Sequence, residues 1–215
     1  MKESKILSVA LSIAIAFLVL TAAIAVPILF RPFYYWQIGP LGLEATTGLS
    51  RSEIIEAYNQ MMNFCIGITH EFSTGVLAWS EWGRSHFVDV RSLFMLDLIV
   101  LGVTALGLLA WRVARSRLHI RPYQFAGRTP GFYAGAGLLS VFIVVGLLAA
   151  TNFSRAFTIF HRLFFPGKEN WIFDPAVDQI ILILPETFFM NCAILILVLL
   201  IGGCLGLMIA GRRRA

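Results

Sequence analysis

The side chains best suited to chemistry lie in two polar segments, each next to a long apolar run. The first segment contains His86, Asp89 and Arg91 and leads into an apolar run that holds Asp97. If this segment is helical from Ser85 onward, steps of three and eleven residues at about 100° each bring His86, Asp89 and Asp97 onto one face. An imidazole and two carboxylates at the entry to a membrane are costly, so such groups usually have a function or a partner.

The second polar segment contributes another imidazole, His161. Its ionisable neighbours are Arg155, Arg162, Asp174, Asp178 and Glu186. Histidine exchanges protons near neutral pH, so His86 and His161 together indicate a functional site. For any single Arg or Asp of these segments, an interfacial charge that reaches toward water explains the residue equally well. Asp97 and Glu186 fit either a proton relay or a buried interhelical hydrogen bond.

The composition places these residues in a membrane protein. Of 215 residues, 58% are hydrophobic and only 13% are charged, whereas soluble domains carry about 25% charged residues. The mean hydropathy is +0.80. The net charge of +5 is compatible with nucleic acid binding, but the basic residues gather next to apolar runs, which argues against that partner.

Four apolar runs are long enough to cross a hydrocarbon layer of ~30 Å as helices. They cover about residues 6–30, 92–113, 131–151 and 184–210, and they alternate with polar inserts at 31–91 and 152–183 and a loop at 114–130. We therefore predict one integral membrane domain over residues 1–215, mainly α, with four transmembrane helices. The first run is longer than the apolar part of a signal peptide, which favours a retained span.

Local signals subdivide the first insert. Phe33–Ile38 is aromatic and is a candidate for a short strand at the interface. Ser50 and Glu53 form a capping box, which predicts a helix that ends near Gly67. Trp79–Gly83 is interpreted as a loop. We expect this insert to lie on the membrane rather than to fold as an independent domain.

The second insert leads directly into the fourth span. Asp174 followed by Pro175 predicts a helix start, with a capping side chain and proline at the first helical position. A helix from there through the fourth span is too long for a straight crossing, so we expect Pro185 to kink it.

The distribution of basic residues predicts the orientation. The amino-terminal tail, the 112–128 segment and the carboxy-terminal tail hold Lys2, Lys5, Arg112, Arg115, Arg117, Arg121, Arg128, Arg212, Arg213 and Arg214. Glu3 is the one acidic residue among them. Because basic segments stay in the cytoplasm, both termini are expected inside and both inserts outside, with His86 and His161 on the outer side. His119 is left inside, and His70 is expected to be structural.

Familiar catalytic signatures are missing from the sequence. It has no G-x-S-x-G turn, no P-loop and no H-E-x-x-H helix. Cys65, Cys192 and Cys204 form no C-x-x-C pair, which argues against a disulfide framework and a zinc ribbon. A covalent serine or cysteine enzyme is therefore not supported, and we expect no cofactor. Two histidines with a carboxylate are able to bind a metal, although no spacing here requires it.

Several of these segments resemble a known family. Glu81–Val90 (EWGRSHFVDV) and Phe160–Phe165 (FHRLFF) are similar to two signatures of the lipoprotein intramolecular transacylase family, and Trp171–Pro175, Asp178 and Leu184–Phe189 are similar to a third. The four-span layout with two outer inserts also fits, so the resemblance covers nearly the whole chain. It implies a multi-pass protein of the bacterial cell membrane.

The resemblance also implies a reaction and a pair of functional residues. The substrate is a diacylglyceryl-modified lipoprotein in the outer leaflet. Its sn-2 acyl chain moves from glycerol to the α-amino group of the amino-terminal cysteine, which gives a lyso-form lipoprotein. The histidines that match the family's functional pair are His86 and His161.

The residue types suit that reaction. The attacking α-amine has a pKa of about 7.7–8.0, and a neutral imidazole can accept its proton. A second imidazole can protonate the departing glycerol oxygen or stabilise the oxyanion. Either His86 or His161 fits either role. Asp89 is expected to orient His86, and Arg155, more than Arg91, to contact a substrate carbonyl or headgroup.

Two other classes of function remain open from the sequence. A metal-dependent membrane hydrolase of lipid or peptide would use His86, His161 and a carboxylate as ligands. A small proton-coupled transporter or sensor would use Asp97 and Glu186 as its relay. Asp178 is expected to support the site in the transacylase reading. Membrane lipid is expected as a partner, and the protein is expected to act as a monomer.

Overall fold

The computed structural model describes residues 2–212, and the chain divides into two compact units. The first unit comprises the described residues up to Ala25, together with Asp97–Leu148 and the residues from Ile196 onward. The second unit comprises Val26–Leu96 and Ala149–Leu195. Arg213 and Arg214, which belong to the predicted cytoplasmic tail, lie outside the described residues.

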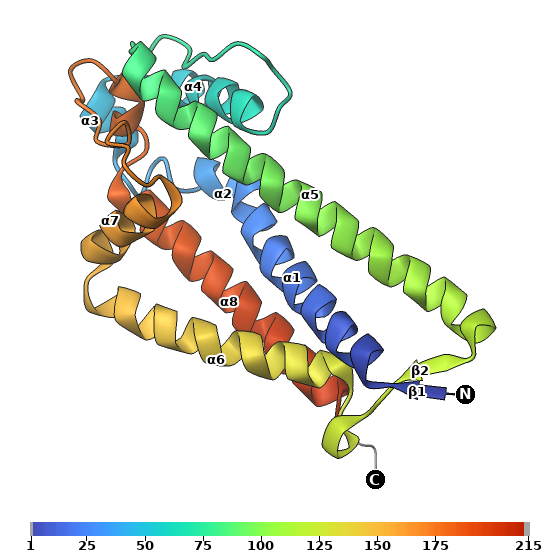
Figure 1. Cartoon of the computed structure of the whole chain (residues 1–215). Helices are drawn as coiled ribbons and strands as arrows, with labels where there is room; N and C mark the ends of the chain where they lie inside the picture. The colour runs from blue at the N-terminus through green and yellow to red at the C-terminus, as the bar shows by residue number, and fades with distance from the viewer. Residues whose placement is uncertain (1, 213–215) are drawn as a thin grey trace. The chain divides into compact units, whose positions relative to one another are not determined.

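Four long helices contribute residues to both units (Figure 1). They are α1 (Lys5–Leu29), α5 (Glu81–Leu118), α6 (Pro130–Thr151) and α8 (Glu186–Ala210). Each is long and apolar enough to cross a membrane. The prediction of a mainly α membrane protein with four such helices is therefore confirmed.

The helix α5 is longer than the sequence suggests. It begins at Glu81, so the loop interpretation of Trp79–Gly83 is wrong for its second half. Its other end lies at Leu118, beyond the predicted end of the span. The early start has a physical cause, because Ser80 caps this end of the helix and a distant carboxylate holds Ser80 in place, as described below.

In the first unit, small residues allow α1, α6 and α8 to approach closely. A Cβ atom added at Gly135 of α6 would lie 2.7 Å from the carbonyl oxygen of Cys204 in α8. One added at Gly203 of α8 would lie 3.1 Å from the side chain of Val19 in α1. Small residues at such contacts are typical of membrane helices, whose association depends on close van der Waals packing.

The first unit also contains the strand pair of the described chain. β1 (Lys2–Ser4) and β2 (Ile120–Pro122) are parallel, and Glu3 forms an ion pair with Arg121 at 2.8 Å. The Ser8 hydroxyl donates to the carbonyl oxygen of Tyr123 at 2.6 Å. A short 3₁₀ helix, η1 (Phe125–Gly127), follows. These contacts connect the amino-terminal segment to the basic loop.

The second unit contains the shorter elements. These are α2 (Pro32–Tyr35), α3 (Leu43–Thr47), α4 (Arg51–Cys65), α7 (Phe153–Phe164) and the 3₁₀ helix η2 (Gln179–Leu182). The predicted capping box at the start of α4 is confirmed, because Ser50 and Glu53 satisfy each other's backbone N–H groups. Gly67, with φ of +80°, follows the end of this helix, as predicted.

The short strand considered at Phe33–Ile38 is wrong. Pro32 stands at the first position of the helix α2, where its fixed φ favours a helical turn. The ring of Tyr34 stacks on Tyr58 of α4 at 3.7 Å between centroids, and its hydroxyl donates to the carbonyl oxygen of Ile183 at 2.9 Å. The aromatic residues therefore form a packed core between elements rather than a strand.

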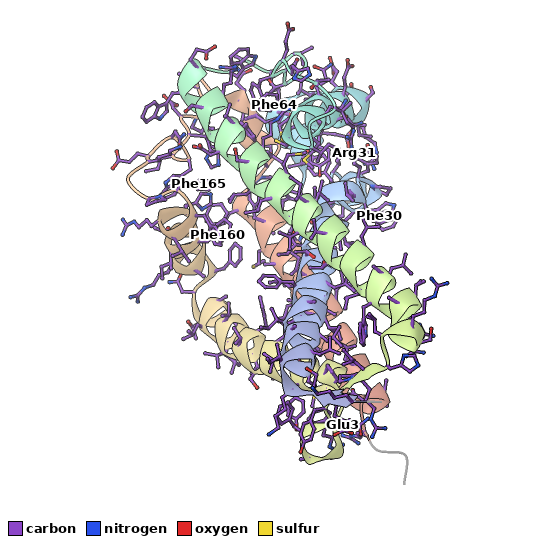
Figure 2. The ribbon with its side chains drawn as sticks, turned by 45° about the vertical axis from the view of Figure 1, so that its right-hand side comes forward. Glu3, Phe30, Arg31, Phe64, Phe160 and Phe165 are labelled. Atoms are coloured by element: carbon purple, nitrogen blue, oxygen red, sulfur yellow. The ribbon has the colours of Figure 1, made fainter. Side chains whose placement is uncertain are left out.

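The junction between α1 and α4 is polar. Arg31 donates to the side-chain oxygens of Asn59 at 3.0 Å and Asn63 at 2.6 Å (Figure 2). The hydroxyl of Tyr35 also donates to Asn59, at 2.6 Å. The amide oxygens of Asn59 and Asn63 accept hydrogen bonds from the Arg31 guanidinium at the end of the first apolar run, so the charge of Arg31 has polar partners.

The expected kinked helix from Asp174 is also wrong. Asp174 accepts a hydrogen bond from the backbone N–H of Ala176 at 2.9 Å, which forms a turn. The 3₁₀ helix η2 follows, and α8 begins only at Glu186, after Pro185. Pro185 interrupts the backbone ladder because it lacks an N–H group, so the chain breaks rather than bends there.

Candidate active site

The second unit brings His86 and His161 together from segments that are far apart in the sequence. His86 lies in the second turn of α5, and His161 lies in the last turn of α7. Their ring centroids are 5.8 Å apart, with 33° between the ring planes. The side chains are only 5% and 7% exposed, respectively. One substrate group is therefore able to lie against both imidazoles.

The local sequence explains why α7 forms. Asn152 caps the helix by accepting a hydrogen bond from the backbone N–H of Arg155 at 2.9 Å. The exposed apolar residues are Ile159, Phe160, Leu163 and Phe164. The polar residues are Ser154, Arg155, Thr158 and Arg162. At about 100° per residue, the two sets occupy separate arcs of the helix, and His161 lies at a boundary between them.

The hydrogen bond of His161 fixes its neutral tautomer. Its Nδ1 lies 2.8 Å from the carbonyl oxygen of Phe157. A carbonyl oxygen only accepts, so Nδ1 carries the proton and Nε2 presents the lone pair. Burial lowers the pKa of His161 from its ordinary value, and the hydrogen bond to Phe157 opposes this shift. A neutral imidazole with a free Nε2 is the form that a general base needs.

Aromatic side chains surround the two imidazoles. Trp171 stacks on His161 with centroids 4.7 Å apart, and Phe157 lies 4.2 Å from the same ring. The ring centroid of Phe165 lies 5.0 Å from that of His86 and 5.8 Å from that of His161. These rings exclude water from the pair, which strengthens electrostatic interactions inside the site.

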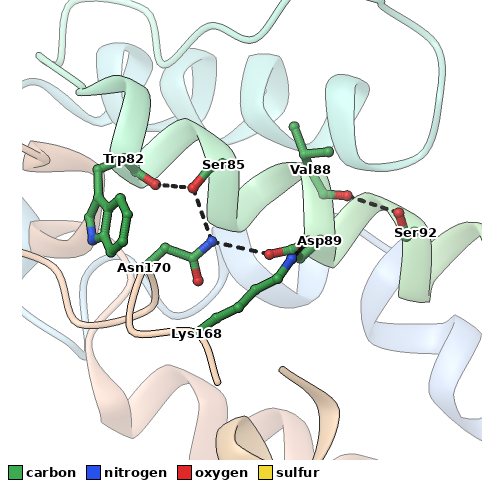
Figure 3. A network of polar contacts seen from close by, with 7 residues as sticks. All are labelled: Trp82, Ser85, Val88, Asp89, Ser92, Lys168 and Asn170. Carbon is green, nitrogen blue, oxygen red and sulfur yellow. Dashed lines mark hydrogen bonds and ion pairs between the residues drawn. The ribbon is translucent and has the colours of Figure 1, made fainter. Parts of the chain in front are cut away.

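The segment 165–173 is held against α5 by a polar network (Figure 3). Lys168 forms an ion pair with Asp89 at 2.5 Å. The amide nitrogen of Asn170 donates to the other oxygen of Asp89 at 3.1 Å and to the Ser85 hydroxyl at 3.0 Å. The hydroxyl of Ser85 in turn donates to the carbonyl oxygen of Trp82 at 2.6 Å. These bonds flank His86 on α5 and fix the segment that contributes Trp171 to the site.

Asp89 was expected to orient His86. Its hydrogen bonds in the described structure connect instead to Lys168 and Asn170. Because Asp89 follows His86 by three residues on the same helix, its charge lies beside the imidazole without a direct bond. Its contribution is thus to hold the segment that covers the histidines.

Asp178 holds Ser80, the residue whose hydroxyl caps the start of α5. Its carboxylate is buried and accepts hydrogen bonds from the backbone N–H of Ser80 at 2.7 Å and from the Ser80 hydroxyl at 2.9 Å. The same hydroxyl accepts from the N–H of Gly83 at 3.0 Å. A Cβ atom on Gly83 would lie 2.2 Å from the Asp178 carboxylate. This close approach fixes the start of α5, and with it the position of His86.

The remaining predicted site residues lie outside this cluster. Arg91 donates to the carbonyl oxygen of Thr69 at 2.8 Å and lies over the ring of Phe64, so it holds the first insert on α5. The side chain of Arg155 is exposed on α7. Glu186 accepts a hydrogen bond from Ser154 at 2.5 Å. Asp97 belongs to the first unit, where one of its carboxylate oxygens is buried without a hydrogen-bond partner among the described residues.

The sequence reasoning missed Lys168, Asn170, Ser80 and Ser85. The one indication in the sequence was that Ser85 and Asp89 are four residues apart, because this spacing places them on one face of a helix. Their partners lie about eighty residues away in the sequence, and no local pattern indicates them. Within residues 2–212, no group of three or more His, Cys, Asp or Glu side chains is arranged to hold a metal ion.

Comparison with known proteins identifies the family. The model of the family "Lipoprotein intramolecular transacylase Lit" matches residues 9–189. The chain belongs to this family. No curated protein sequence matches it. The predicted family, fold class and enzyme class are thereby confirmed, and the chain is a membrane acyltransferase of the Lit family.

Solved structures of a Lit protein are similar to this chain. The membrane integral lipoprotein intramolecular transacylase Lit from Bacillus cereus superposes with a TM-score of 0.84 at 25% identity, covering 95% of this chain and 92% of the relative. Two structures of that protein with a histidine replaced by arginine or by alanine give TM-scores of 0.77 at 25% identity. They cover 95% of this chain and 88% and 90% of the relative, respectively.

Proposed function

We propose that His86 and His161 catalyse the transfer of an sn-2 acyl chain within a diacylglyceryl-modified lipoprotein. The acyl chain leaves the glycerol oxygen and joins the α-amino group of the amino-terminal cysteine, giving the lyso-form. The observation that carries this proposal is the buried histidine pair, with 5.8 Å between the ring centroids. Nucleophile and ester belong to one substrate, so the main contribution of the enzyme is to hold them in register.

His161 is the general base in this proposal. Its Nδ1 proton is donated to Phe157, which leaves Nε2 free to accept a proton from the attacking amine. As the C–N bond forms, the ester carbonyl oxygen becomes an oxyanion. His161 then returns the proton to the glycerol oxygen as the C–O bond breaks. No acyl-enzyme intermediate forms.

His86 stabilises the oxyanion. Its Nδ1 atom is buried and has no hydrogen-bond partner among the described residues. An unpaired buried nitrogen is costly unless a substrate completes its bonding. In the tautomer protonated at Nδ1, it donates to the carbonyl oxygen as negative charge develops there. Preorganised donors of this kind lower the barrier most effectively in sites that exclude water.

The amphipathic pattern of α7 suits a substrate held in lipid. We propose that its apolar arc faces acyl chains, while Arg155 and Arg162 face headgroups. His161 lies at the boundary between the arcs, where glycerol esters lie in a bilayer. The basic residues of the 112–128 segment and both tails favour a cytoplasmic location for the termini, which places this site at the outer leaflet.

The test is mass spectrometry of a lipoprotein's amino-terminal peptide from a host that lacks other N-acylating enzymes. Expression of this protein is expected to move one acyl chain from oxygen to nitrogen at constant total mass. His86→Ala and His161→Ala are expected to abolish the product. His70→Ala serves as the matched control, because His70 is an exposed histidine away from the pair. Full product formation by either site variant would contradict the assignment.

A further inference from the structure

Asn170 combines deep burial with an unsatisfied oxygen. Its side chain is 4% exposed, and its Oδ1 atom has no hydrogen-bond partner among the described residues. A buried amide oxygen without a donor destabilises the folded protein, because the oxygen loses its hydrogen bonds to water and gains none. Almost all buried polar groups in folded proteins have a hydrogen-bond partner, so this oxygen is a candidate acceptor for a donor from a bound molecule.

The network around Asn170 determines which way the amide faces. Asp89 forms an ion pair with Lys168, so its carboxylate is an acceptor. It must therefore face the nitrogen of the Asn170 amide rather than its oxygen. The oxygen points away from Asp89. The amide is also anchored by Ser85, the residue directly before His86.

The neighbours of Asn170 place it at the histidine pair. The next residue, Trp171, stacks on the ring of His161. Phe173, two residues later, lies 5.5 Å from the ring of His86. Asn170 therefore lies beside the histidine pair. Ser85 and Asp89 hold its amide nitrogen, and its Oδ1 atom has no partner among the described residues.

We propose that Oδ1 of Asn170 accepts a hydrogen bond from the α-amino group of the lipoprotein's amino-terminal cysteine. This inference rests on the proposed function and adds a positioning residue to it. The reacting end of the substrate offers esters and a thioether, which only accept, so its donors are the α-amine and the peptide N–H groups. A bond from one N–H to Asn170 directs the nitrogen lone pair toward the ester while another proton passes to His161.

The test uses the full-length protein and two unreactive lipopeptides. Both carry ether-linked chains in place of the esters; one has a free α-amine, and the other has hydrogen in its place. Wild-type protein is expected to bind the amine form about tenfold more tightly, the effect of one hydrogen bond to a polar or charged donor. Equal binding of the two lipopeptides would overturn the proposal without any variant.

Variants then assign the preference to Asn170. Asn170→Leu, which keeps the branched shape of the side chain, and Asn170→Ala are expected to bind both lipopeptides with nearly equal affinity. Ser85→Ala removes an anchor but keeps the oxygen, so it is expected to retain a preference for the amine. If Asn170→Leu or Asn170→Ala keeps the full preference, the α-amine has another partner and the proposal is wrong.

Failure of this inference is distinguishable from failure of the proposed function. If wild-type protein forms the N-acyl product but binds the two lipopeptides equally, only the role of Asn170 is contradicted. If the protein forms no product, the transacylation itself is contradicted. If a peptide N–H were the donor to Asn170, wild-type protein would bind both lipopeptides equally and Asn170→Leu would weaken the binding of both, so that alternative also gives a separate result.

Discussion

At the scale of single residues, the site depends on two imidazoles that are kept neutral. His161 is buried among aromatic rings, and its hydrogen bond to Phe157 selects one tautomer. A cation in such surroundings is costly because it loses hydration. The same burial that disfavours the protonated form therefore prepares His161 to act as a base at neutral pH.

The pH dependence of kcat/KM follows from this burial. The attacking amine, with a pKa of about 7.7–8.0, and His161 must both be unprotonated in the free reactants. Because burial lowers the pKa of His161, protonation of this residue is expected only below pH of about 6.5. A plot of log kcat/KM against pH should rise with a slope of two at low pH. Above the pKa of His161 the slope should fall to one, and near pH 8 the plot should become level.

Initial rates of N-acyl product formation across this pH range provide the measurement. The pKa of the lipopeptide amine, determined by titration of the free substrate, is the control that identifies the upper break. A lower break above pH 6.5 would mean that the base is not a buried neutral histidine, and the assignment of His161 would be withdrawn.

At the scale of elements, contacts between distant segments set the ends of the helices. α5 begins at Glu81 because the Ser80 hydroxyl accepts from the N–H of Gly83, and the carboxylate of Asp178, 98 residues from Ser80, holds Ser80 in place. α7 begins at the cap Asn152. A capping residue next to its helix is visible in the sequence, whereas a distant carboxylate that holds the capping residue is not.

Gly83→Ala tests the importance of this distant carboxylate. The added methyl group would lie 2.2 Å from Asp178, so the carboxylate must move and the capping residue Ser80 loses its partner. The expected loss of folding free energy is about 2 kcal/mol, typical of overpacking and of lost caps. Thermal unfolding in lipid nanodiscs measures it as a lower Tm, accompanied by lower activity because His86 is displaced.

Gly102→Ala is the matched control on the same helix. Nothing lies within 4 Å of a Cβ atom at that position, and alanine favours helix more than glycine does. Its Tm is expected to equal or exceed that of the wild type. Equal stability of the two variants would show that the approach of Asp178 to α5 is not required for folding.

At the scale of the whole molecule, membership in the Lit family and four apolar helices establish a multi-pass membrane protein. The orientation is a prediction from charge. In the described chain, the amino-terminal segment, the 112–128 segment and Arg212 together contain eight basic residues, with Glu3 as the one acidic residue among them. Segments rich in Lys and Arg are retained on the cytoplasmic side.

Cysteine labelling on intact cells tests the orientation. After Cys65, Cys192 and Cys204 are replaced by alanine, Ser52→Cys and Ser116→Cys each introduce one exposed thiol with nearly the same side-chain shape. A membrane-impermeant maleimide is expected to label the cysteine at position 52 and not that at position 116. Permeabilised cells, in which both should react, are the control. The reverse pattern would place the histidine pair on the cytoplasmic side.

The sequence by itself determined the membrane class, the four long helices, the capping box of α4 and the two histidines that are able to take part in catalysis. Each of these depends on patterns that are continuous in the sequence, such as the length of an apolar run or the spacing of a cap. The family resemblance added the reaction. The strand at Phe33–Ile38 was wrong because a tertiary contact, the stacking of Tyr34 on Tyr58, overrides local β propensity.

Only the tertiary structure decided how the site is built. It brought His86 to His161, gave Asp89 the partners Lys168 and Asn170, and placed Asp178 at the start of α5. Lys168 and Asp89 are 79 residues apart in the sequence. Contacts of this kind depend on the packing of whole elements, and side chains near in space carry no common local pattern, so the sequence names the reactive groups but not their partners.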